Sequence, residues 1–163
     1  MSVTAKNNAL PWLGLSALLI ALDQWSKSVA VANLGYQNPV PLIPGFWNWT
    51  LTHNTGAAFS LLARAGGWQH GFFITLAFLI SGALAVALAK LSRNDWRNAL
   101  PFALVIAGAL GNVVDRLRFG YVIDFIQWYW KEFYWPVFNL ADSCIVVGAT
   151  LLVLFSLIAG KRG

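Results

Sequence analysis

The chain is short of charge, of cysteine and of histidine. Only 10% of its 163 residues are charged, whereas a soluble domain of this size carries about a quarter charged residues. Its single cysteine, Cys144, excludes an internal disulfide framework and a cysteine-based metal site, and we interpret it as a small packing residue. With two histidines, His53 and His70, a metal site would have to rest mainly on the six acidic residues. We therefore expect neither a metal nor another cofactor.

Long apolar windows take the place of the missing charge. The chain is 58% hydrophobic, and windows without acidic or basic residues cover 7–22, 65–89, 98–114 and 143–160. A membrane-spanning helix needs about 20 mostly apolar residues. The sequence therefore predicts an all-α membrane protein that forms one integral membrane domain over residues 1–163. Its four transmembrane helices are expected at about 10–31, 68–90, 98–115 and 139–160.

The first apolar segment also resembles a cleavable signal peptide, because Lys6 precedes it and Ala30-Val31-Ala32 follows it. Asp23 and Lys27 would interrupt such a segment, so a retained span is the better interpretation. These two side chains lie four residues apart and can pair on one helix face. Alone, the pair indicates only a structural role.

Two long connections join the spans. Residues 33–67 are rich in turn formers, and Phe46–Thr52 alternates apolar and polar residues with the period of a strand. We expect a small extramembrane β-structured segment at about 40–62. Residues 118–138 are dense in aromatic side chains, which is typical of the headgroup level of a membrane. We expect an interfacial helical or loop segment there, on the same outer side.

Charge is divided unevenly between the two sides of the predicted bundle. With four spans, both termini and the turn at 90–97 share one side, which carries a net charge of +5, while the other side is neutral overall. Positive loops stay in the cytoplasm. Both termini are therefore predicted to be cytoplasmic, and a set of polar residues should gather at the outer leaflet: Asp23, Asn54, Asp115, Asp124 and Asp142.

Four of the six acids lie between residues 115 and 142, and three of these, Asp115, Asp124 and Asp142, lie at the edges of apolar segments. A carboxylate in such a place costs free energy and is a functional candidate. Two carboxyls at close range cannot both ionise cheaply, so one stays protonated while the other acts as a base. Aspartic proteases use such a pair to activate water against an amide. We predict that Asp124 and Asp142 form this pair. The donors available to stabilise the developing oxyanion are Asn54, Asn112, Arg116 and Asn139.

Each residue also has a purely structural interpretation. Asn139 followed three residues later by Asp142 resembles a capping box at the start of the fourth span. Asp124 could be a solvated loop acid, and Asp115-Arg116 could be an exposed pair at a helix end.

The third span carries small residues at helix-packing spacing. Gly108 and Gly111 indicate a close approach of a second helix. For Asn112, an interhelical hydrogen bond and a substrate contact are equally compatible with its position.

Five short motifs occur in order over residues 23–143: Asp23-Gln24-Trp25-Ser26-Lys27, Asn54-Thr55-Gly56-Ala57-Ala58-Phe59-Ser60, Gly111-Asn112-Val113-Val114-Asp115-Arg116, Val122-Ile123-Asp124-Phe125 and Phe138-Asn139-Leu140-Ala141-Asp142-Ser143. Each motif is weak alone. Together, in this order, they resemble the motif set of bacterial lipoprotein signal peptidase, also called signal peptidase II.

The resemblance implies an aspartic endopeptidase of the bacterial cytoplasmic (inner) membrane. Such an enzyme removes the signal peptide of a prolipoprotein by cleaving before a cysteine that carries diacylglycerol. It implies Asp124 and Asp142 as the catalytic residues. Site-lining and supporting positions would be Asn54, Asn112, Arg116, Asn139, Gly108, Asp115, Asp23 and Lys27. The implied partners are the lipidated signal peptide, membrane lipids and peptide antibiotics such as globomycin, with no nucleic acid, and we expect a monomer.

Two other functions could use the same residues. A Ser/Lys peptidase could use Lys27 with Ser26, Ser28 or Ser60, although adjacent helical residues do not face each other. A proton or ion pathway could use Asp23, Asp115, Asp124 and Asp142, although none of them lies deep in the inner half. If the aspartates do the chemistry, Ser60→Ala and Lys27→Met should preserve it.

Overall fold

The computed structural model describes residues 7–56 and 67–160. A short 3-10 helix, Leu10–Trp12, leads into the first long helix, and the elements follow in this order: α1 (Leu13–Asn33), β1 (Val40–Ile43), β2 (Trp47–Asn54), α2 (Trp68–Lys90), α3 (Trp96–Phe119), β3 (Val122–Trp130), β4 (Phe133–Tyr134) and α4 (Leu140–Gly160).

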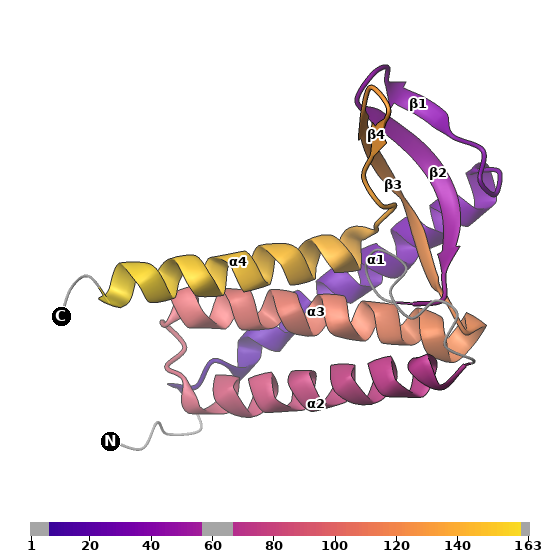
Figure 1. The fold of residues 1–163 in the computed structure, drawn as a ribbon. Coiled ribbons are helices and arrows are strands. Elements are labelled where there is room, and N and C mark those ends of the chain that lie inside the picture. Colours follow the sequence, from indigo (N-terminus) through magenta and orange to yellow (C-terminus); the bar gives the residue numbers. More distant parts are fainter. Residues whose placement is uncertain (1–6, 57–66, 161–163) are drawn as a thin grey trace.

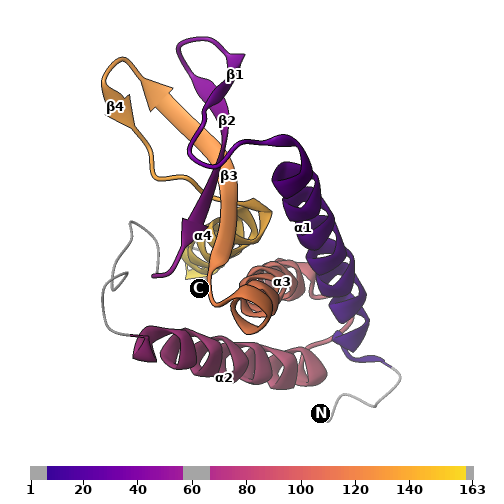
Figure 2. The same cartoon turned by 90° about the vertical axis from the view of Figure 1, so that its right-hand side faces the viewer.

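Helix α3 is the centre of the helical part. It packs against α1, α2 and α4, which lie around it in the view down the bundle (Figure 2). Among the described helices, three are long and apolar enough to cross a membrane: Trp68–Lys90, Trp96–Phe119 and Leu140–Ile158. Many large apolar side chains on the outside of the bundle, such as Leu79 and Val153, are exposed, as expected of a surface that faces lipid. The chain is therefore a multi-pass membrane protein.

A four-stranded antiparallel sheet stands at the end of the bundle away from both termini (Figure 1). Its strand order is β1-β2-β3-β4, so β2 from the first long connection pairs with β3 from the second. The register places Thr52 opposite Asp124 and Asn54 opposite Val122. A buried apolar cluster of Ala30, Leu51, Ile123 and Phe125 attaches this sheet to α1.

The prediction of a helical or loop segment over residues 118–138 was wrong, whereas the mostly helical membrane fold with a small β-structured part agrees with the structure. These residues form the end of α3 and strands β3 and β4, not a helical or loop segment at the interface. The β-branched and aromatic residues of Val122–Trp130 favour a strand. Pairing with β2 then supplies partners for the strand's backbone groups, a non-local effect that aromatic density alone does not reveal. In the other connection, the predicted β-segment at 40–62 is confirmed by β1 and β2, and its residues 57–62 lie outside the described part.

The predicted spans agree with the helices to within a few residues. The span at 68–90 matches α2, while α3 continues four residues beyond the predicted end at 115. Gly120 ends α3 in a left-handed conformation, with φ at 77°. The small residues predicted to pack closely do so, because a Cβ on Gly108 would meet the Ala141 carbonyl oxygen and lie 2.6 Å from Ile145 Cγ1.

Candidate active site

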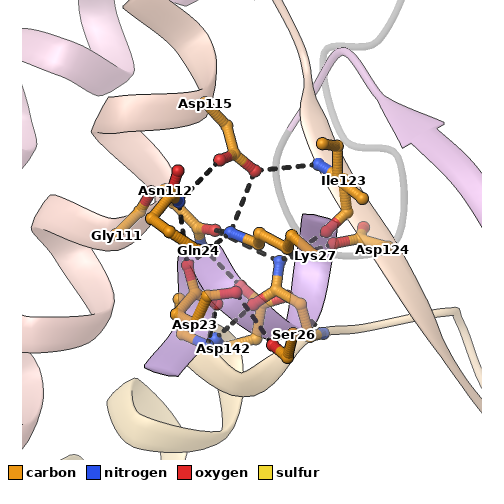
Figure 3. Close-up of polar contacts among 12 residues, drawn as sticks. Asp23, Gln24, Ser26, Lys27, Gly111, Asn112, Asp115, Ile123, Asp124 and Asp142 are labelled. Carbon is orange, nitrogen blue, oxygen red and sulfur yellow. Dashed lines mark hydrogen bonds and ion pairs between the residues drawn. The ribbon is translucent and has the colours of Figure 1, made fainter. Parts of the chain in front are cut away.

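The predicted site residues come together where α1, the C-terminal end of α3 and the N-terminal end of α4 meet strands β2 and β3. Figure 3 shows Asp124 and Asp142 in this region, with Asn112 and the Asp23–Lys27–Asp115 group beside them. Most of these side chains are buried in spite of their polarity, with Asp124 1% exposed and Asn139 0% exposed, whereas Asn54, Arg116 and Asp142 are half-buried. Asp124 is therefore not a solvated loop acid. Buried polar groups need partners, and each of these has them.

Asn139 binds both predicted catalytic acids. Its Nδ2 donates to Asp124 Oδ1 at 2.7 Å, and its backbone N–H donates to Asp142 Oδ2 at 3.3 Å. Its Oδ1 accepts from the Asp142 backbone N–H at 2.8 Å, which completes the predicted capping box at the start of α4. The cap and the site are thus the same set of contacts, and both acids lie against one residue.

Two further amides complete the surroundings of the acids. Asn112 Nδ2 donates to Asp142 Oδ1 at 2.7 Å, and Asn54 Nδ2 donates to Asp124 Oδ2 at 3.1 Å. The contact from Asn112 on α3 to α4 is an interhelical hydrogen bond, and the residue also lines the cavity described below. All three asparagine amides thus donate to carboxylate oxygens, although they were predicted as donors to an oxyanion.

The Asp23–Lys27 pair is part of a larger buried ion cluster. Lys27 Nζ lies 2.8 Å from Asp23 Oδ2 and 2.9 Å from Asp115 Oδ2, and it donates to Asn112 Oδ1 at 3.1 Å. An ammonium has three hydrogens, so each is matched by an acceptor. Asp115 is fully buried, which excludes its interpretation as an exposed helix-end acid.

The environment of Asp124 favours its protonated form. Burial, followed by the negative charge of Asp142, raises the pKa of Asp124 to about 8. Hydrogen bonds from Asn54 and Asn139 and the positive charge of Lys27 oppose that rise. At neutral pH the Asp124 carboxyl can therefore hold the proton that a general acid must supply.

A cavity of about 540 Å³ opens between α2, α3 and α4 beside these acids. Asp142, Asn112, Asn54 and Arg116 form its polar end, and the remainder is largely apolar, with Leu76, Ile80, Ile145, Val146 and Phe138 among its lining residues. Arg116 donates from Nη2 to the Gly56 carbonyl oxygen at 2.8 Å and lies over the Phe73 ring at 5.0 Å. Its buried Nε has no hydrogen-bond partner among residues 7–56 and 67–160.

Sequence reasoning missed Gln24. Its Nε2 donates to Asp115 Oδ1 at 2.8 Å and lies 3.2 Å from both Asp23 Oδ2 and the Gly111 carbonyl oxygen. The signal was its position next to Asp23 in the first motif. Gln24 helps to hold the ion cluster against α3.

The structure does not support a Ser/Lys site at the described serines. The Ser26 hydroxyl donates to the Asp23 carbonyl oxygen and the Ser28 hydroxyl to the Gln24 carbonyl oxygen, each at 2.8 Å. Lys27 is held by two carboxylates. Ser60 lies outside the described residues.

In the part of the chain that is described, no group of three or more His, Cys, Asp and Glu side chains could hold a metal ion.

Comparison with known proteins gives a consistent result. The profile of the family described as "Signal peptidase (SPase) II" matches residues 15–158. A lipoprotein signal peptidase of Xanthomonas campestris pv. campestris (strain 8004) is 58% identical over 162 residues, which cover 99% of this chain and 97% of the relative. One of Xylella fastidiosa (strain M12) is 55% identical over 155 residues, covering 95% and 93% of the two chains.

Solved structures resemble the fold as well. A structure described as a bacterial membrane enzyme at 2.3 Å resolution superposes with a TM-score of 0.84 and 27% identity, covering 99% of this chain and 95% of the other. A second bacterial membrane enzyme, at 1.9 Å resolution, gives a TM-score of 0.75 and 30% identity, covering 90% and 92%.

Proposed function

This chain belongs to the signal peptidase II family, and from that premise we propose that it removes the signal peptides of lipidated prolipoproteins with Asp124 and Asp142 as its catalytic pair. The observation that carries the assignment of the pair is their shared contact with Asn139, which brings two carboxyls from β3 and α4 to one point. Asp142 also lies in the wall of the largely apolar cavity.

The proposed reaction divides the two acid–base roles between the pair. Asp142 accepts a proton from a water molecule, whose oxygen attacks the carbonyl carbon of the scissile amide. Asp124, protonated at neutral pH, gives its proton to the leaving nitrogen as the C–N bond breaks. Arg116 is the donor proposed to bind a substrate carbonyl oxygen, because its guanidinium-bearing side chain lines the same cavity as Asp142.

The cavity suits the chemistry of the substrate. A signal helix and the acyl chains of a lipidated cysteine are both apolar, and α2, α3 and α4 offer a largely apolar lining that ends at Asp142. The scissile bond would then lie at the polar end. A peptide antibiotic such as globomycin would compete for the same cavity. All of these groups come from one chain, so we propose that a monomer is active.

Helix length and charge distribution support a proposal for how the enzyme lies in its membrane. α1 has 21 residues, which span about 31 Å in a helix, and we propose that it is a fourth span of a single domain in the bacterial inner membrane. The distribution of Lys and Arg favours cytoplasmic termini. The sheet stands at the opposite end of the bundle (Figure 1), so the site would lie at the outer leaflet.

The test is cleavage of a lipidated precursor by purified protein. Asp124→Asn and Asp142→Asn should each abolish turnover while the protein still inserts into membranes. Asp95→Asn is the matched control, because Asp95 lies in the turn before α3 and its carboxylate accepts an exposed hydrogen bond from Asn98. Near-normal turnover by either site variant would refute the catalytic pair. Cleavage of an unlipidated precursor at the same rate would refute the substrate class.

A further inference from the structure

The backbone next to each proposed catalytic acid is held by a second, non-catalytic carboxylate. Asp115 Oδ2 accepts from the Ile123 N–H at 3.0 Å, directly before Asp124. Asp23 Oδ1 accepts from the Ala141 N–H at 3.0 Å, directly before Asp142. The two acids lie on different elements, β3 and α4, yet each is positioned through the residue that precedes it.

One cation contacts both of these non-catalytic carboxylates. Lys27 Nζ contacts Asp23 Oδ2 at 2.8 Å and Asp115 Oδ2 at 2.9 Å, and its side chain is 2% exposed. Figure 3 shows the ammonium between the two carboxylates. Without it, two negative charges would remain buried close together, and each would be free to turn away from its backbone N–H.

The third hydrogen of Lys27 fixes the orientation of Asn112. An ammonium can only donate, so Asn112 must present Oδ1 to it, and Nδ2 is thereby directed to Asp142. Asn139 Nδ2 also approaches Asn112 Oδ1, at 3.1 Å, but it faces Ile123 O and Asp124 Oδ1 as well. An amide nitrogen has two hydrogens for these three acceptors. Lys27, rather than Asn139, is therefore the donor that fixes the orientation of the Asn112 amide.

We propose that Lys27 is a positioning residue that sets the relative placement of Asp124 and Asp142 by holding Asp115, Asp23 and Asn112 at once. The inference rests on the proposed function, because it assigns a role in that reaction to a group that does not itself touch the substrate. It also changes an expectation from the sequence, namely that Lys27→Met would preserve the chemistry.

The first test is the kinetics of Lys27→Met with a lipidated precursor. A displacement of about 1 Å can cost about 10²-fold in rate, so kcat should fall by about that factor while KM changes little. The pH profile of the remaining activity should move to higher pH, because Lys27 opposes the rise in the pKa of Asp124. Ser16→Ala is the control: it removes another buried contact between α1 and α3, from Ser16 Oγ to the Ala103 carbonyl oxygen. It should leave kcat and the pH profile unchanged.

A second variant separates positioning from charge balance. The triple substitution Asp23→Asn, Lys27→Met, Asp115→Asn leaves no unpaired charge, so it should fold even if Lys27→Met does not. The proposal expects it to remain about 10²-fold slow in kcat. Turnover at the wild-type rate would overturn the proposal, as would an equal loss in Ser16→Ala or an unshifted pH profile in a folded Lys27→Met protein. Failure of the wild-type protein to cleave, or activity in Asp124→Asn, would instead refute the proposed function.

Discussion

Asn139 offers the sharpest test of how the site is built, because one side chain both caps α4 and contacts the acids. Two substitutions separate these roles. Asn139→Asp keeps an oxygen for the Asp142 N–H but replaces the amide donor that faces Asp124 with a carboxylate oxygen. Asn139→Ala removes the cap and the donor together.

The magnitudes follow from the contacts. Loss of an N-cap costs about 1 kcal/mol of stability. Loss of the amide donor leaves Asp124 Oδ1 and the Ile123 carbonyl oxygen short of a partner, at about 1–3 kcal/mol for each buried group. Asn139→Ala should therefore be destabilised by about 3–7 kcal/mol. A hydrogen bond to a neutral group such as protonated Asp124 is worth about 0.5–1.5 kcal/mol, and 1.36 kcal/mol is a factor of ten in rate, so both variants should lose about two- to tenfold in kcat.

The assay combines thermal unfolding in detergent with cleavage of a lipidated precursor below the unfolding temperature. Asn139→Asp should retain the helical cap, yet its turnover should be as low as that of Asn139→Ala or lower, because a third carboxylate then faces Asp124. If Asn139→Asp cleaves at nearly the wild-type rate, Asn139 is only a helix cap, and the reasoning about the acids is wrong.

Two further predictions concern pH and packing. Above about pH 8, kcat/KM should fall about tenfold per pH unit, because ionised Asp124 has no proton to give; constant cleavage rates up to about pH 10 would contradict this. Gly108→Val should lower both thermal stability and kcat, because the added carbons would push α4, and Asp142 with it, away from α3. Gly82→Ala, which adds a methyl where nothing lies within 4 Å, is the control for both measurements and should lower neither of them.

The features that could be predicted from the sequence are those set by local spacing. The Asp23–Lys27 pair follows from i, i+4 geometry, and the Asn139–Asp142 box from the start of an apolar run. The span at 68–90 follows from its hydropathy alone.

The features that could not be predicted depend on contacts between distant segments. The strand at Val122–Trp130 exists because β2 lies beside it, and nothing local in residues 118–138 indicates which partner it has. The same holds for Asp115, whose partners include the Ile123 N–H, and for the asparagine amides, whose direction is decided by neighbours on other elements. The residue types indicated polar contacts, but only the fold determines which atoms donate to which.

The pairing of β2 with β3 determines when a newly made chain can become active. The two strands are separated along the chain by α2 and α3, and the second acid is carried by α4. A chain still attached to the ribosome after α3 has inserted contains Asn54 but lacks Asp124, Asn139 and Asp142. With Asp124 and Asp142 as the proposed catalytic pair, the site is complete only after α4 has been made and has packed against α3.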